Sequence, residues 1–156
     1  MKIEEEFEPS IHLKADAFIP EEYISDMTLR LSTYRRIASS KTHEAVEAIE
    51  SEIEDRFGKM PEEVGNLTDI MRLKITAREL LIAKIQDSNG RVIVTFSPDT
   101  KIEPKDIFGL REKSTVNMRF LPDGFDLDLK GFSREEGYKR LSEIMDELKK
   151  GAALLV

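Results

Sequence analysis

Apolar residues recur along this chain with two different periods. Between residues 11 and 19 the odd positions are apolar and the even ones are mostly polar, the period of two expected of a half-buried extended segment, which Phe18 interrupts. After Pro20 the apolar residues recur at intervals of three and four, the period of an amphipathic helix. A period of two returns beyond Asp87. The pattern therefore predicts helices first and strands afterwards.

Three helices are predicted in the first half of the chain, over residues 20–38, 42–58 and 61–83. Prolines followed by acidic residues suit the starts of the first and third, and Thr42 and Gly58 suit the two ends of the second. The residues expected to face the core in the first helix are Ile24, Met27, Leu31 and Tyr34. Those in the second are Val46, Ile49, Ile53 and Phe57, and those in the third are Val64, Leu67, Met71, Ala77 and Leu80 or Leu81.

The second half of the chain predicts two hairpins and a closing helix. Residues 87–90, with the sequence DSNG, and residues 122–124, with the sequence PDG, are strong turn signals beside alternating apolar positions. A short helix is expected over residues 104–110. Ser133, with Glu136 three residues later, forms a capping-box signature for a last helix that ends near Gly151. The apolar positions of that helix are Tyr138, Leu141, Ile144, Met145 and Leu148.

This order of elements is typical of an α+β fold with three N-terminal helices, followed by a small antiparallel sheet of two hairpins and a C-terminal helix, with the helices on one side of the sheet. Residues 1–10 are acidic and show no period, so we expect a tail or the end of a linker there. Residues 11–156 are expected to form a single domain. The apolar residues 152–156 are expected either to pack on that domain or to form a docking tail.

Charge and composition narrow the classes of partner. The 31 acidic and 24 basic residues give a net charge of -7, which opposes binding to nucleic acid. The chain has no cysteine, and this fits a reducing compartment such as the cytoplasm. No apolar run approaches the roughly 20 residues that a membrane-spanning helix needs, and the acidic start is unlike a signal peptide.

Motifs for catalysis are absent from the sequence. Its eight glycines never form the phosphate-binding pattern GxxxxGK followed by Ser or Thr, so nucleotide hydrolysis is not expected. His12 and His43 have no partner at metal-ligand spacing, and carboxylate pairs arise by chance in a chain with 31 acidic residues. We therefore expect no catalytic site, no metal and no cofactor.

One block of the sequence is specific. It combines Ile19-Pro20, Tyr23-Ile24, the YRR run at residues 34–36, and the DRFG run at residues 55–58. The DRFG run ends three residues before Pro61. In this order and at these places, the motifs resemble the C-terminal domain of bacterial transcription-repair coupling factors. The resemblance covers residues 11–96 and is looser beyond them.

That resemblance implies a regulatory role without catalysis. A domain of this kind is expected to fold back on an N-terminal domain similar to an excision-repair helicase and to cover its docking surface for a repair protein. Full-length members are implied to engage double-stranded DNA, RNA polymerase and the damage-recognition subunit of excision repair. The chain carries no ATPase motif, so we expect it to be a C-terminal fragment of a larger multidomain protein, with a stand-alone paralogue as the alternative.

The candidate interface lies on the predicted second helix. Six carboxylates gather there, namely those of Glu44, Glu47, Glu50, Glu52, Glu54 and Asp55. Glu52 and Asp55 are the preferred contact residues, and Arg56 is expected to pair with Glu52 across one helical turn. A second interpretation is a DNA- or polymerase-contacting face formed by Arg30, Arg35, Arg36 and Lys41. A plain solvated acidic helix is the alternative to both.

Overall fold

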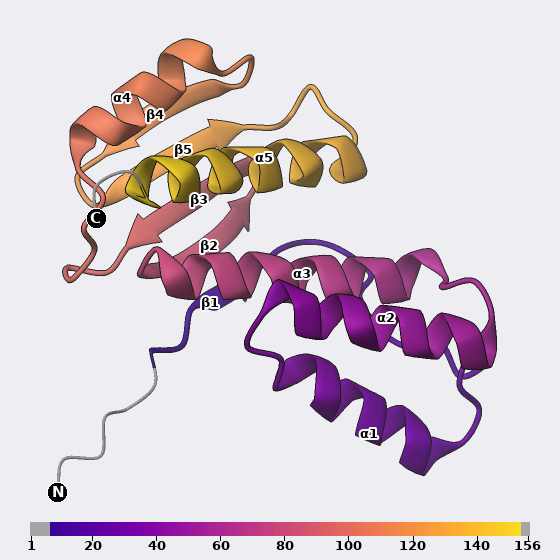
Figure 1. The fold of residues 1–156 in the computed structure, drawn as a ribbon. Coiled ribbons are helices and arrows are strands. Elements are labelled where there is room, and N and C mark those ends of the chain that lie inside the picture. The colour runs from indigo at the N-terminus through magenta and orange to yellow at the C-terminus, as the bar shows by residue number, and fades with distance from the viewer. Residues whose placement is uncertain (1–6, 154–156) are drawn as a thin grey trace, which may run out of the picture. The chain divides into compact units, whose positions relative to one another are not determined.

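Residues 7–153 are described by the computed structural model, and they contain five helices and five strands (Figure 1). In chain order the elements are β1 (Ser10–His12), α1 (Met27–Ala38), α2 (His43–Phe57), α3 (Glu62–Glu79), β2 (Ile82–Ser88), β3 (Arg91–Phe96), α4 (Pro104–Lys113), β4 (Asn117–Leu121), β5 (Gly124–Asp128) and α5 (Arg134–Ala153). The predicted α+β class is confirmed.

The chain divides into two compact units. Residues 15–75 form the first, called here the helical unit. The described residues up to Lys14 and those from Thr76 onward form the second, called here the sheet unit. The boundary at Ile75 falls inside α3. A single domain over residues 11–156 stays a prediction.

The first helix begins later than predicted. The N–H groups of Tyr23 and Ile24 both donate to the carbonyl oxygen of Pro20, which makes residues 20–24 a turn. The helix α1 begins at Met27, because the carboxylate of Asp26 accepts a hydrogen bond from the Leu29 N–H at 2.8 Å and so caps the helix. Pro20 thus marks a turn that precedes the helix.

The predicted core face of this helix was partly wrong. Met27 and Leu31 are 65% and 48% exposed, whereas Thr33 and Ile37 are buried. Thr33 tolerates burial because its hydroxyl donates to the Leu29 carbonyl oxygen at 2.8 Å. Tyr34 is half-buried.

The third helix ends at Glu79, before the predicted end near residue 83. Leu81 has a φ of 55°, which a helix cannot contain. Ile82 and Ile85 then become fully buried in β2. The apolar residues around 80–82 fit both periods, and pairing of β2 with β3 decides between them.

Both predicted hairpin turns are confirmed, in a sheet with the strand order β1-β2-β3-β5-β4. Asn89 and Gly90 have φ values of 53° and 85°, the pair of positive angles that a tight turn between β2 and β3 favours. Residues 122–123 join β4 to β5. Because β5 lies between β3 and β4, it contributes partners to both, with Val94 opposite Phe125 and Arg119 opposite Asp126.

The sheet is mixed, although it was predicted to be antiparallel. The difference is β1, which pairs in parallel with β2 and places Ile11 opposite Ile85. Ser10, predicted to end the acidic tail, is the first residue of β1. Residues 1–6 of that tail lie outside the described residues. The predicted alternation over residues 11–19 persists as alternating exposure, and Phe18 fits it as a 45% exposed residue.

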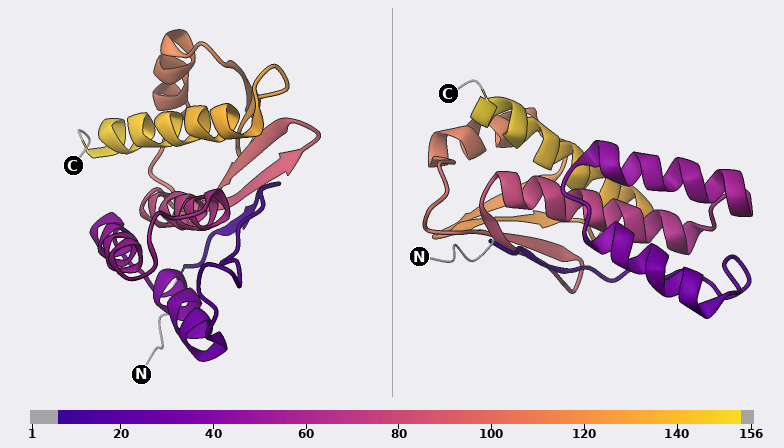
Figure 2. Two further views of the ribbon diagram at one scale, coloured as in Figure 1. Left: turned by 90° about the vertical axis from the view of Figure 1, so that its right-hand side faces the viewer. Right: turned by 60° about the horizontal axis from the view of Figure 1, so that its bottom comes forward.

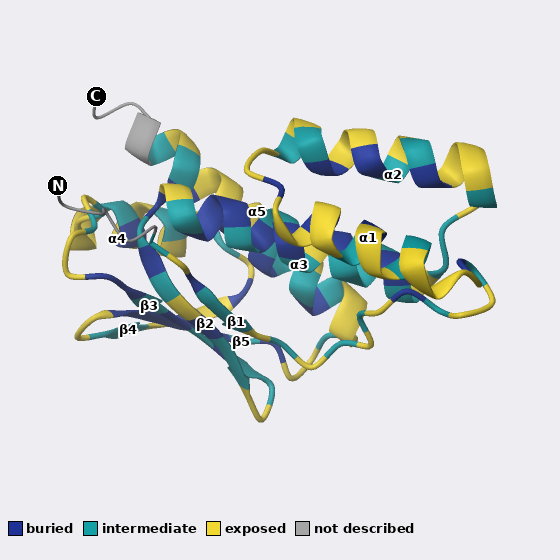
Figure 3. Ribbon diagram, turned by 90° about the horizontal axis from the view of Figure 1, so that it is seen from below, coloured by how far each residue is buried: buried dark blue, intermediate teal, exposed yellow. Residues whose placement is uncertain are grey.

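Helices cover one face of the sheet within the sheet unit, as predicted. Figure 2 shows α4 and α5 on the same side of the strands. The buried apolar side chains of the sheet come from alternate positions, Val92 and Val94 in β3 and Phe125 and Leu127 in β5. Figure 3 shows a matching buried side along α5. The Ser133 hydroxyl accepts a hydrogen bond from the Glu136 N–H at 3.2 Å, which confirms the predicted cap of this helix.

Candidate interaction surface

The helix α2 is fixed at both ends by the predicted residues. The Thr42 hydroxyl accepts a hydrogen bond from the Ala45 N–H at 3.1 Å, and the Gly58 N–H donates to the Glu54 carbonyl oxygen at 2.9 Å. Val46, Ile49 and Ile53 are buried in the core of the helical unit. With this stripe turned inward, the opposite side of α2 faces solvent.

Glu52 lies between two arginines. Arg36 of α1 donates a hydrogen bond to its carboxylate, and the Arg56 guanidinium lies 3.9 Å from it across one helical turn. The hydrogen bond from Arg36, together with the charges of Arg36 and Arg56, lowers the pKa of Glu52. All three side chains are between 41% and 51% exposed. These three residues, called here the Glu52 cluster, form a partly exposed ionic group that spans α1 and α2.

An aromatic pair, Tyr23 and Phe57, packs against the Arg56 side chain of the cluster. The Arg56 guanidinium lies 5.2 Å from the centre of the Phe57 ring, and Tyr23 meets that ring edge-on at 5.9 Å. The Tyr23 hydroxyl donates to the Gly58 carbonyl oxygen at 2.7 Å. The end of α2 is therefore held in place, and Arg56 is held with it.

Asp55 lies next to the cluster but outside it. The residue is exposed, and its carboxylate forms no hydrogen bond or ion pair with the rest of residues 7–153. Glu44, Glu47 and Glu54 are exposed on α2 as well. Of the three predicted interface residues, the structure thus joins Glu52 to Arg56 and leaves Asp55 open to solvent.

The prediction that Glu50 belongs to this acidic surface is wrong. Its side chain is 16% exposed and accepts a hydrogen bond from the Thr68 hydroxyl at 2.8 Å. Arg72 of α3 donates to both of its carboxylate oxygens. The helical spacing already contained this signal, because Glu50 lies four residues after Val46 and three before Ile53.

The arginines of the second interpretation do not form one surface. Arg30 donates to the Ile24 carbonyl oxygen at 2.9 Å, and Arg36 belongs to the Glu52 cluster. Arg35 and Arg36 are neighbours in sequence and so point about 100° apart around α1. Lys41 lies beyond the end of the helix.

Neither histidine belongs to a group of side chains that could hold a metal ion in the described part of the chain. The His12 Nε2 atom is 2.6 Å from the Ser10 hydroxyl oxygen, and His43 begins α2. Within residues 7–153, no three His, Cys, Asp or Glu side chains are grouped closely enough to hold a metal ion. No helix in the same range is long and apolar enough to span a membrane.

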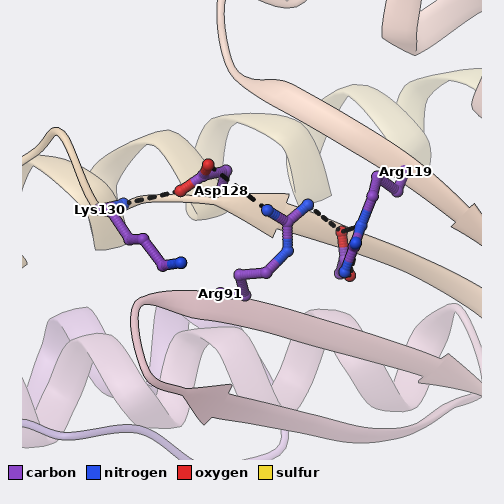
Figure 4. A network of polar contacts seen from close by, with 5 residues as sticks. Arg91, Arg119, Asp128 and Lys130 are labelled. Carbon is purple, nitrogen blue, oxygen red and sulfur yellow. Dashed lines mark hydrogen bonds and ion pairs between the residues drawn. The ribbon is translucent and has the colours of Figure 1, made fainter.

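A second ionic group, which sequence spacing did not indicate, lies on the sheet (Figure 4). Arg91 of β3 and Arg119 of β4 both donate to Asp126 of β5, at 2.9 Å and 2.6 Å. Asp126 is almost fully buried, and the hydrogen bond from Arg119 is the main cause that lowers its pKa to about 2. Only the strand order β3-β5-β4 brings these residues together.

Known proteins are similar to this chain in sequence and in fold. The family model of the TRCF domain matches residues 13–107. The transcription-repair-coupling factor of Escherichia coli is 34% identical over 109 residues, which cover 70% of this chain and 10% of that protein. The factor of Myxococcus xanthus is 31% identical over 118 residues, which cover 76% of this chain and 10% of that protein. The chain thus spans about a tenth of the length of these relatives.

The crystal structure of a C-terminal domain of transcription-repair coupling factor has the same fold. It superimposes with a TM-score of 0.81 at 20% identity and covers 92% of this chain and 95% of that one. The fold similarity therefore extends past residue 96, where the sequence resemblance becomes looser. The resemblance inferred from the IP, YI, YRR and DRFG motifs is confirmed, and the chain belongs to the TRCF domain family of transcription-repair-coupling factors.

Proposed function

We propose that this domain is a regulatory protein-interaction module without catalytic activity. It docks on the N-terminal repair-helicase-like domain of a full-length coupling factor and covers that domain's docking surface for the excision-repair damage-recognition subunit. The contact surface is the Glu52 cluster together with Asp55. Family membership supports the choice of partner, and the geometry of α2 supports the choice of surface.

The observation that carries this proposal is the exposed charged group at the end of α2. Glu52 is held in one orientation by two arginines, while the adjacent Asp55 carboxylate is exposed. A basic residue of the partner placed opposite Asp55 would meet a carboxylate beside an already oriented ionic group, with little further ordering cost. Tyr23 and Phe57 fix the backbone beneath this group.

The exposure of these charges suits a reversible contact. Ion pairs between exposed side chains contribute about 0.2–1 kcal/mol each and weaken as salt is added. Such contacts determine orientation and association rate more than affinity. A module that releases its partner when the parent protein becomes active would use contacts of this strength.

The second interpretation, a nucleic-acid or polymerase contact through arginines, has less support. Arg30 and Arg36 are engaged within the chain, and the arginines of α1 point in different directions. Tight binding of double-stranded DNA by this chain at low salt would favour it over the docking proposal.

The docking surface is tested by Asp55→Lys, with Asp146→Lys on α5 as the matched control. Both aspartates are exposed on helices, and both substitutions change the charge by the same amount. We expect Asp55→Lys to weaken binding to the isolated N-terminal domain about tenfold, since one attraction is lost and one repulsion is added. Titration calorimetry with and without added salt measures this.

A competition experiment tests whether this chain covers the surface of the N-terminal domain that binds the damage-recognition subunit. We expect this chain, added in trans, to compete with the damage-recognition subunit for the N-terminal domain, and Asp55→Lys to compete less. If a folded Asp55→Lys variant bound the N-terminal domain as tightly as the wild type does, the proposed contact surface would be wrong. Binding without competition would remove the covering role.

A further inference from the structure

An open cavity of about 340 Å³ lies in the sheet unit, between the β2–β3 turn, the segment that follows β5 and the first turns of α5. Its lining includes Lys14, Asp87, Lys130, Phe132, Arg134 and Tyr138. This volume is at the small end of the range for ligand-binding pockets, about 300–1,000 Å³. The docking proposal uses none of these residues.

The floor of the cavity is tied together by hydrogen bonds. The Tyr138 hydroxyl lies 3.0 Å from one oxygen of Asp87 and 3.2 Å from the Lys14 carbonyl oxygen. The other oxygen of Asp87 accepts a hydrogen bond from the Gly90 N–H at 3.2 Å. Both oxygens of the one carboxylate at the cavity wall are therefore engaged with the protein.

Three cationic residues line this cavity. Lys14, Lys130 and Arg134 are exposed, and none of their ammonium or guanidinium groups forms a hydrogen bond or ion pair with another residue in the range 7–153. Against the single charge of Asp87 they leave a net charge of +2 at the cavity, in a chain whose net charge is -7. The net charge of the lining residues is therefore opposite in sign to that of the whole chain.

The Lys130 side chain lies against Gly90, another residue of the cavity lining. A Cβ atom at position 90 would lie 2.7 Å from the Cγ atom of Lys130, so any other residue there would force this side chain to shift. In Figure 4 the backbone N–H of Lys130 is joined to Asp128, while its ammonium group extends without a partner among the residues drawn. The start of the 20-residue helix α5 adds partial positive charge on the same side, which Glu135 and Glu136 in its first turn partly offset without lining the cavity.

We propose that this cavity binds a phosphate oxyanion, either as free inorganic phosphate or as the phosphate group of a small molecule. Lys14, Lys130 and Arg134 contact the phosphate oxygens, and the Phe132 wall accepts the apolar part of a larger ligand. A phosphate fits because it accepts several charge-assisted hydrogen bonds at once. The overall charge of -7 opposes a long polyanion, so nucleic acid is not the ligand.

The test is a titration of the whole chain with sodium phosphate, followed by amide NMR shifts at constant ionic strength. We expect saturable shifts centred on residues 130–137. Titration with adenosine monophosphate distinguishes the two sources: tighter binding than that of phosphate assigns a phosphorylated small molecule, and equal binding assigns the free ion.

Lys130→Gln should weaken phosphate binding roughly fivefold, the effect of removing one partly exposed charge contact. Lys139→Gln removes the same charge from an exposed position of α5 that does not line the cavity, and it should bind phosphate as the wild type does. Arg134→Gln gives a second, independent variant. The proposal is overturned if no saturable shifts occur, or if folded Lys130→Gln and Arg134→Gln variants bind as well as Lys139→Gln.

Discussion

Gly58 ends α2 in a backbone conformation that residues with a side chain rarely adopt. Its φ of 88° and ψ of -171° lie in a region that is essentially restricted to glycine. Its carbonyl oxygen accepts the hydrogen bond from Tyr23, so the same residue ends the helix and anchors the aromatic pair beneath Arg56. The DRFG motif thus joins an interface candidate to the glycine that fixes its position.

Replacing Gly58 with alanine should lower the free energy of unfolding of the helical unit by about 1–3 kcal/mol, the usual cost of such a conformation. Gly65→Ala is the control, because Gly65 lies inside α3 and an added Cβ would meet no atom within 4 Å. That change should be neutral or stabilising by up to about 1 kcal/mol. Urea denaturation of both variants measures the difference, and equal stability would contradict the strain assigned to Gly58.

At the scale of elements, α2 carries carboxylates of two kinds. Glu44, Glu47 and Asp55 are exposed, whereas Glu50 links α2 to Thr68 and Arg72 of α3 inside the helical unit. The composition of the helix does not separate these kinds. Its packing does, because α3 shields Glu50 from most of the solvent and supplies its partners.

Glu50→Ala should therefore destabilise the chain by about 2 kcal/mol, since Arg72 and Thr68 lose a largely buried partner. Glu47→Ala removes the same group from the exposed side and should change stability by less than about 0.5 kcal/mol. The helix propensity gained from alanine is the same at both sites and cancels in the comparison. Thermal unfolding followed by circular dichroism tests this, and similar losses for the two variants would show that Glu50 is not structural.

At the scale of the whole molecule, the sheet is joined by an ionic group that takes one residue from each of three strands. Asp126 is buried and accepts hydrogen bonds from Arg119 and Arg91. These bonds, mainly the one from Arg119, lower the pKa of Asp126 to about 2 from the ordinary value of 3.8. A carboxyl whose pKa is lowered by folding stabilises the native state while it is ionised.

The contribution of Asp126 should be fully present above pH 4 and should be lost as the pH falls from about 4 to 2. The shift corresponds to roughly 2 kcal/mol. Asp126→Asn should therefore be less stable than the wild type at pH 6, and the two should converge near pH 2. Hydrogen exchange of the β5 amides at several pH values measures this, and a difference that does not depend on pH would contradict the ionic role.

Several features were determined by sequence alone, because they depend on residues close together in the chain. The caps at Thr42 and Ser133, the stop at Gly58 and the two hairpin turns follow from local backbone chemistry. The spacing of Val46, Ile49 and Ile53 likewise determined which side of α2 is buried. The motifs of residues 19–58 were sufficient to identify the family.

Tertiary structure decided the features that depend on distant partners. The end of α3 and the start of β2 depend on pairing with β3, and the parallel strand β1 depends on a partner more than seventy residues away. The burial of Glu50 depends on Arg72, and the Asp126 group depends on the order of three strands. Local patterns record the period of an element, but a side chain's charged partner and its access to water are determined by which elements become neighbours.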